Sequence, residues 1–122
     1  MIHITGDTHG DFFMLEFSLR VWGAKKGDIV IILGDVGFNY HLDERDEEKK
    51  AQMNDLGITF FCIQGNHEKR PDDLDGYHEM EWHGGIVYVQ DEYPNLLFAK
   101  DGSIYDFNGK KAVVLGGAYS VD

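Results

Sequence analysis

Three short segments of the chain combine glycine with side chains that could bind a metal ion. Asp7 and His9 lie in the first segment, Asp35 lies in the second, and Asn66 lies in the third with His67 beside it. Carboxylate, imidazole and amide groups together suit manganese, iron or zinc better than calcium, which prefers oxygen ligands alone. The residue types therefore predict a site for divalent metal ions.

Each segment also has an ordinary structural explanation. Glycine beside aspartate or asparagine is common in turns, because glycine adopts unusual backbone angles and the short polar side chain bonds to nearby backbone. The three segments share a further property, since each directly follows an apolar run that is typical of a strand. Ligands bind outside the carboxyl ends of the strands of an open α/β sheet, so these segments are expected to converge there.

The first half of the chain predicts alternating strands and helices. Apolar runs indicate strands at residues 2–4, 28–33 and 58–63. Helical spacing begins at Asp11 and stops at Gly23, and a polar segment at residues 42–56 predicts a second, largely exposed helix. This order favours parallel strands joined by right-handed crossovers.

The second half predicts short antiparallel strands. Four candidates occur, at residues 85–89, 96–100, 103–107 and 111–115. Asp101-Gly102 and Asn108-Gly109 lie between successive candidates and are typical of hairpin turns. A parallel unit followed by an antiparallel meander is therefore expected.

The composition limits the classes of partner and location. A content of 43% hydrophobic residues with only two prolines is typical of a globular chain, and 122 residues suit a single domain. The net charge of −11 disfavours nucleic acid and anionic membranes as binding partners. Cys62 is the only cysteine and lies in an apolar run, so it is expected in the core. No secretion signal or membrane-length apolar stretch is evident, which favours a cytoplasmic location.

The ordered segments Asp7-Thr8-His9-Gly10, Gly34-Asp35 and Gly65-Asn66-His67-Glu68 resemble the first three motifs of calcineurin-like metallophosphoesterases. The resemblance implies an α/β fold that forms the front part of an αββα sandwich, with residues 1–122 as one domain that is incomplete at its C-terminal end. It also implies a hydrolase that cleaves a phosphate mono- or diester with water activated between two divalent metal ions.

The resemblance also implies a role for each site residue. Asp7 and His9 bind the first metal, Asp35 bridges both metals, Asn66 binds the second, and His67 acts on the leaving group. Two nearby cations lower the pKa of a shared water and neutralise charge on phosphate oxygens. A histidine beside a ligand can donate a proton to the departing alkoxide.

Two departures from the family pattern affect this expectation. In the family's protein phosphatases the second motif continues with an aspartate and an arginine, where this chain has Phe38 and Asn39. His67 therefore lacks its usual orienting partner, and a protein phosphatase is disfavoured. The family also completes its metal sites with a later histidine and a Gly-His-x-His loop, and neither occurs before Asp122.

Two functions are therefore open: a phosphoesterase, or a truncated non-catalytic module that binds a metal or a partner. The expected substrate is a phosphate ester, no membrane partner is expected, and nucleic acid is expected only as a substrate. Half of a sandwich would expose an apolar face or an unpaired strand, so self-association or pairing with a missing C-terminal part is also expected.

The other histidines have simpler explanations. His3 lies within the first strand and is expected to pack there, and His41 is expected in a solvated loop. His78 and His83 flank a tryptophan in residues 77–84, a segment that could shape a substrate pocket or cover the sheet.

Overall fold

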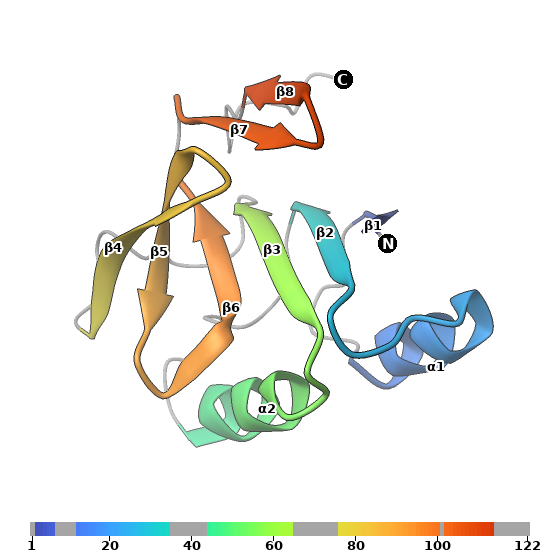
Figure 1. The fold of residues 1–122 in the computed structure, drawn as a ribbon. Helices are drawn as coiled ribbons and strands as arrows, with labels where there is room; N and C mark the ends of the chain where they lie inside the picture. The colour runs from blue at the N-terminus through green and yellow to red at the C-terminus, as the bar shows by residue number, and fades with distance from the viewer. Residues whose placement is uncertain (1, 7–11, 35–43, 65–75, 101, 114–122) are drawn as a thin grey trace.

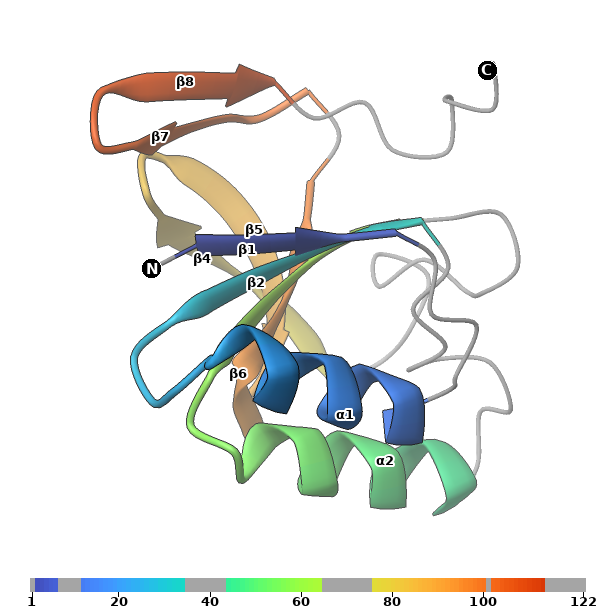
Figure 2. The ribbon, with the colours of Figure 1, turned by 90° about the vertical axis from the view of Figure 1, so that its right-hand side faces the viewer.

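The computed structural model describes residues 2–6, 12–34, 44–64, 76–100 and 102–113 (Figure 1). Most of the described strands form one six-stranded sheet, in the spatial order β1 (Ile2–Thr5), β2 (Ile29–Gly34), β3 (Thr59–Gln64), β6 (Tyr93–Ala99), β5 (Gly85–Gln90) and β4 (Tyr77–Trp82). The other described elements are helices α1 (Phe12–Trp22) and α2 (Glu44–Asn54) and a hairpin of β7 (Ile104–Phe107) with β8 (Lys110–Val113). Figure 2 shows the helices, the sheet and the hairpin as successive layers.

The first half of the chain folds as the sequence predicted. β1 pairs with β2 and β2 pairs with β3, in both cases parallel. Both helices cover one face of the sheet (Figure 2), as right-handed crossovers require. Leu15 of α1, Met53 of α2 and Phe60 of β3 meet in the core between these layers, and Cys62 is buried with them as expected. Neither described helix is long and apolar enough to cross a membrane.

Glycine ends helix α1 at the predicted position. Gly23 has a φ of 73°, a left-handed conformation that suits glycine because it has no Cβ. The backbone N–H of Ala24 can then donate to the carbonyl oxygen of Leu19 at 2.9 Å. The predicted stop is confirmed, and the chain turns from there toward β2.

Helix α2 lies at the predicted place, but its charged run is only partly solvated. Asp46 and Lys50 are each 3% exposed, and Met53 is fully buried. The Nζ of Lys50 donates a hydrogen bond to Oε1 of Gln90 at 2.8 Å and lies 3.5 Å from Oε2 of Glu47. The helix is largely exposed as predicted, but on this side the sheet approaches it and supplies polar partners for the buried charge.

Aromatic side chains complete the contact between α2 and the sheet. The hydroxyl of Tyr93 donates to Oε1 of Glu47 at 2.8 Å. Burial, together with this hydrogen bond, raises the pKa of Tyr93 to about 12. The Nζ of Lys50 lies 5.5 Å from the centre of the Tyr77 ring and 5.9 Å from that of Tyr93. Both aromatic rings therefore attract the buried ammonium group, and this attraction partly offsets its lost hydration.

Strand β6 departs from the predicted meander. It is antiparallel to β5 but parallel to β3, with Phe60 opposite Leu96 and Cys62 opposite Phe98. β6 and β7 flank Asp101-Gly102 in the sequence but do not pair with each other, since they belong to different sheets. The predicted hairpin there is wrong, since β6 is already paired on both sides and the chain leaves to start another layer.

Residues 77–84 form a strand and a turn that the sequence analysis did not predict. β4 pairs antiparallel with β5 and lies at the edge of the sheet. His83 and Gly84 have φ values of 49° and 83° and connect Trp82 to its partner Gly85. The exposed Glu79 and Glu81 on β4 are typical of an edge strand, where charge discourages pairing with another chain.

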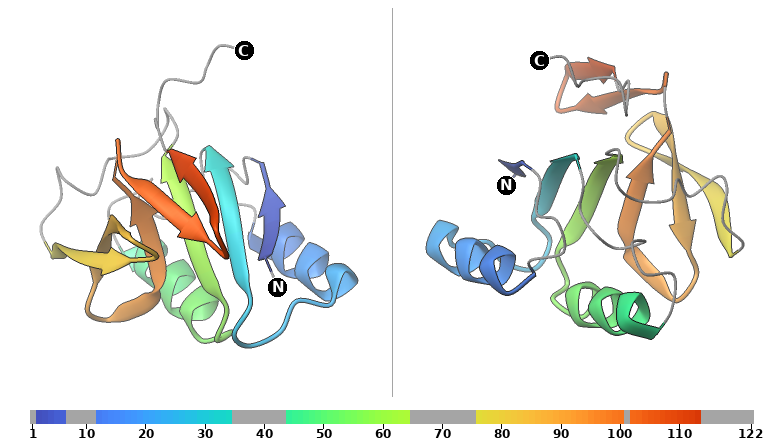
Figure 3. Two further views of the ribbon diagram at one scale, coloured as in Figure 1. Left: turned by 45° about the horizontal axis from the view of Figure 1, so that its top comes forward. Right: turned by 180° about the vertical axis from the view of Figure 1, so that it is seen from behind.

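The β7–β8 hairpin begins a second layer on the face of the sheet opposite the helices (Figures 2 and 3). Asn108 and Gly109, with φ values of 56° and 89°, connect the strands, which confirms the predicted turn. Tyr105 of β7 is fully buried between the hairpin and the sheet, and its ring meets the Phe61 ring edge-on with centres 4.8 Å apart. Aromatic packing therefore holds the two layers together.

The hairpin leaves part of this face open. Ile4 of β1 is 63% exposed and Leu33 of β2 is 44% exposed. Both lie on the side of the sheet that carries the hairpin, because side chains alternate between faces and Ile4 is paired with Ile31, which packs toward the aromatic core there. The β1–β2 region thus presents apolar surface on which a further layer could pack.

A buried carboxylate fixes the amino end of β2. Asp28 is 4% exposed, and its Oδ2 lies 3.2 Å from Nε2 of His3 and 3.1 Å from the backbone N–H of Lys25, which donates to it. These two hydrogen bonds, with that of His3 the stronger influence, lower the pKa of Asp28 from 3.8 to about 2.

The fold is expected to lose part of its stability in acid through Asp28. The folded-state pKa lies below the unfolded value, so the stabilising effect is present above about pH 4 and disappears as the pH falls toward about 2. Asp28→Asn should remove that part of the pH dependence. Urea unfolding of both proteins across this range measures the difference. Parallel pH profiles for the two proteins would contradict the assignment.

Candidate metal-binding site

The described strand ends determine where the three motif segments begin. β1 ends at Thr5, opposite Ile32 of β2, and Gly34 at the end of β2 lies opposite Gln64 at the end of β3. Neighbouring strands are about 4.8 Å apart, so the three strands span about 10 Å at this edge. The segments that follow them therefore all start from the carboxyl edge of the parallel part of the sheet.

The five predicted site residues follow these strand ends and lie outside the described residues: Asp7, His9, Asp35, Asn66 and His67. Their convergence stays a prediction. It is supported by the described backbone, because Asp35 directly follows β2 and Asn66 is the second residue after β3. The donor types suit a pair of divalent ions, and loops leaving adjacent strands suit ligands shared between ions 3.5 to 4 Å apart, a typical spacing.

Strand β6 adds a fourth carboxyl end to the same edge. It runs parallel to β3, so its carboxyl end lies beside that of β3.

 Ala99 is the last residue of β6, and Lys100 follows it. The sequence analysis missed this pairing because the apolar run was assigned to a meander. The run Leu96 to Ala99 is buried on both faces of the sheet, and such an unbroken run is the signal of a central strand.

The remaining described histidines do not build a metal site. His3 is confirmed as a packing residue, since its ring stacks on Trp22 with centres 6.0 Å apart and it contacts Asp28. His78 lies 3.4 Å from an exposed Asp91 oxygen, and His83 lies in the β4–β5 turn. Among the residues with described positions, no group of three or more histidine, cysteine, aspartate or glutamate side chains could hold a metal ion.

The sequence was also compared with known proteins. A family model described as calcineurin-like phosphoesterase matches residues 1–121. Searches of curated proteins and of solved structures returned no match. The family match covers every motif segment and every described element of the chain.

Proposed function

The chain belongs to the calcineurin-like phosphoesterase family, and from this premise we propose that it builds a dinuclear metal centre that hydrolyses a phosphate mono- or diester. Family membership implies a metal-dependent phosphoesterase kind of function. The observation that carries the more specific proposal is the adjacency of β1, β2 and β3, whose carboxyl ends lead into the three motif segments.

The proposed ligands come from all three segments. Asp7 and His9 hold one ion, Asn66 holds the other, and the carboxylate of Asp35 is shared between them. The ions, when bound, lower the pKa of a coordinated water and neutralise charge on the phosphate. Asp35 has the central role because it follows the middle strand of the three, with β1 and β3 on either side.

His67 is the proposed acid of the reaction. It follows Asn66 directly in the sequence, and both residues come within three positions of the carboxyl end of β3. A proton on an imidazole nitrogen can be donated to the leaving alkoxide, which is otherwise a poor leaving group. Phe38 and Asn39 offer no carboxylate to orient this ring and no guanidinium to bind phosphate. We therefore disfavour a protein phosphatase.

The alternative is a non-catalytic module that binds a metal or a partner. It is favoured by the small number of candidate ligands, because four side chains shared between two ions leave several coordination positions to water. The exposed Ile4 and Leu33 add apolar surface that a second copy or another polypeptide could cover.

Metal titration of the 122-residue chain tests the proposal. We expect manganese to bind weakly and an aryl phosphate to be hydrolysed slowly, because four side chains shared between two ions leave several coordination positions to water. Bound manganese should stabilise the fold by about 1.4 kcal/mol at ten times its dissociation constant, measured as a higher melting temperature. Light scattering in the same titration reports association.

The Asp7→Asn chain is the control for this titration. It should lose the manganese-dependent stabilisation, because a carboxylate ligand becomes a neutral amide. A melting temperature that never responds to manganese, or that responds equally in both chains, would contradict the proposed centre. Tight binding of two ions with rapid hydrolysis would instead exclude the non-catalytic alternative.

A further inference from the structure

The described part of the chain exposes most of its large apolar side chains near one edge of the sheet. Six of the nine such side chains lie on β1, α1 and β2: Ile2, Ile4, Phe17, Val21, Trp22 and Leu33. β1 stands at the end of the strand order, and β2 is its only neighbour among the described strands. Figure 2 faces this edge, with β1 and α1 nearest the viewer. An edge strand flanked by apolar side chains is a typical place for another chain to pair.

Two isoleucine side chains flank the outer edge of β1 on the hairpin side of the sheet. His3 lies on the helix side, because its ring stacks on Trp22 of α1. Side chains alternate along a strand, so Ile2 and Ile4 lie on the hairpin side, where Ile4 is 63% exposed. The hairpin therefore leaves this part of β1 uncovered.

Helix α1 flanks the same edge on the other face of the sheet. Glu16 accepts a hydrogen bond from Gln52 of α2, so this side of α1 faces α2. Each residue of a helix turns by about 100°, which places Val21 about 140° from Glu16 around the helix axis. Val21 thus faces away from α2 and past the edge of the sheet, and it is 68% exposed. Figure 1 shows α1 at the β1 end of the sheet and α2 farther in.

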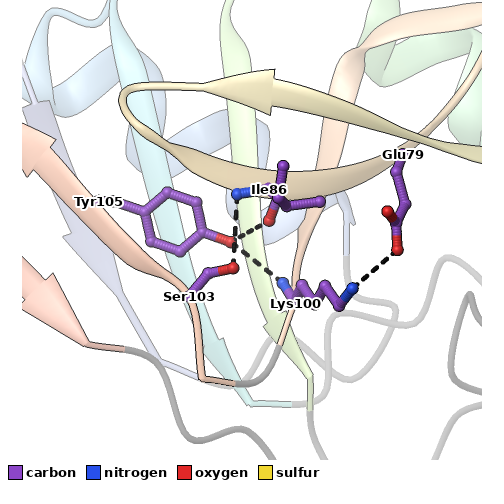
Figure 4. A network of polar contacts seen from close by, with 5 residues as sticks. All are labelled: Glu79, Ile86, Lys100, Ser103 and Tyr105. Carbon is purple, nitrogen blue, oxygen red and sulfur yellow. Dashed lines mark hydrogen bonds and ion pairs between the residues drawn. The ribbon is translucent and has the colours of Figure 1, made fainter.

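The two edge strands of the sheet differ in charge. β4 carries the exposed Glu79 and Glu81, and the Nζ of Lys100 donates to Oε2 of Glu79 at 2.8 Å (Figure 4). Charged side chains on an edge strand discourage pairing with another strand. β1 has no aspartate, glutamate, lysine or arginine, and α1 has only Glu16 and Arg20, whose charges balance. In a chain with a net charge of −11, a second, equally charged copy therefore meets less repulsion at β1 and α1 than at β4.

We propose that β1 and α1 join two copies of this chain about a two-fold axis, with β1 antiparallel to β1 of the second copy. A strand edge presents both N–H donors and carbonyl acceptors, so it can pair with an identical edge that runs in the opposite direction. This pairing brings Ile2 and Ile4 of both copies together on one face of the joined sheet. It brings the two α1 helices, with Val21 between them, together on the other face. A second copy therefore covers the apolar side chains on both faces of the edge, whereas an oppositely charged partner would be attracted to acidic surface elsewhere.

Sedimentation equilibrium of the 122-residue chain tests this inference. One strand and one helix form a small interface, so the dimer is expected to dissociate in the micromolar range, and loadings from about 1 μM to about 1 mM cover it. The mass should rise from 13.9 kDa toward twice that value. Ile4→Lys and Val21→Glu should each weaken association about tenfold or more, because each brings like charges close together across the two-fold axis. Both side chains are exposed, so the melting temperature of the monomer should change little.

Two further variants locate the interface on the sheet. Met80→Lys is the matched control for Ile4→Lys, because Met80 is exposed on β4 at the opposite edge, and it should leave association unchanged. Leu33→Lys tests whether two sheets stack face to face instead. Leu33 lies on the hairpin side of β2, one strand in from the edge, so edge pairing predicts a smaller effect than that of Ile4→Lys.

Hydrogen exchange reports the strand pairing itself. The outward N–H groups of β1 gain carbonyl partners in the dimer, so exchange of the amide protons of residues 2–5 should slow as the protein concentration rises. In Val21→Glu this dependence on concentration should disappear over the same range, because the interface no longer forms.

Several results would overturn the inference. A chain that stays monomeric at every loading excludes the dimer. Equal effects of Ile4→Lys and Met80→Lys would remove the interface from the β1 edge. Dissociation by Leu33→Lys but not by Val21→Glu would show sheets stacked face to face, and amide exchange in β1 that is independent of concentration would exclude strand pairing. All of these measurements are made without metal, so they leave the proposed metal centre to its own titration.

Discussion

The Asp35→Asn protein is expected to lose both metal ions and metal-dependent hydrolysis together. Asparagine keeps the shape of the side chain but removes the negative charge that would hold two cations close to each other. Changes to the outer partners of metal ligands already reduce metal affinity about 10- to 100-fold, so loss of a shared ligand should reduce it by more. Metal content by atomic emission, measured beside hydrolysis of an aryl phosphate by the same protein, tests this.

Two other substitutions should change metal content and turnover differently from Asp35→Asn. His67→Ala should retain the metal ions and lose about 100- to 10,000-fold in turnover, because a proton donor is removed while the ligands stay. Asp28→Asn is the matched control, since Asp28 precedes β2 and Asp35 follows it, at opposite ends of one strand. It should retain both metal content and turnover near neutral pH. Full activity in Asp35→Asn or His67→Ala would contradict the assigned roles.

Phe61→Ala is expected to reduce the free energy of unfolding by about 3 to 5 kcal/mol, which is the usual effect of deleting a buried aromatic ring. Phe61 is 1% exposed, and its ring centre lies 4.8 Å from those of both Trp82 and Tyr105. It also lies 6.2 Å from that of Phe107. The ring therefore joins the sheet to the hairpin, and its removal leaves a cavity between the two layers.

Urea unfolding of Phe61→Ala and Phe17→Ala measures this effect with a matched control. Phe17 is 54% exposed on α1, so the same chemical change there should alter the unfolding free energy by less than about 1 kcal/mol. If the two variants were equally stable, the aromatic core between the sheet and the hairpin would not hold the layers together. Near-ultraviolet circular dichroism should also report looser packing around Trp82 in Phe61→Ala.

Local sequence determined the elements whose signals lie within a few residues. Gly23 ends α1 because that position requires a left-handed backbone conformation. Asn108-Gly109 joins β7 to β8 because both positions have positive φ. Unbroken apolar runs indicated β2 and β3 as buried strands, and their order with the helices was sufficient for the parallel βαβαβ unit. The motif order was likewise sufficient to suggest the family, which the family model confirms.

The candidate site was predictable only in part. The motif segments could be assigned to the ends of three strands, and those strands are adjacent and parallel. The arrangement of Asp7, His9, Asp35, Asn66 and His67 stays a prediction. The place of β6 beside them was not predictable, because it depends on pairing with β3 across more than thirty residues of chain.

Only the tertiary structure decided which strands pair and which charges are buried. An apolar run shows that a strand is covered, but not which neighbour lies beside it, so β6 could be read as part of a meander. Lys50 belongs to a charged helix, yet it is buried because Gln90 and the rings of Tyr77 and Tyr93 approach it from distant parts of the chain. Pairing and burial depend on contacts between residues far apart in sequence, and local spacing carries no information about those contacts.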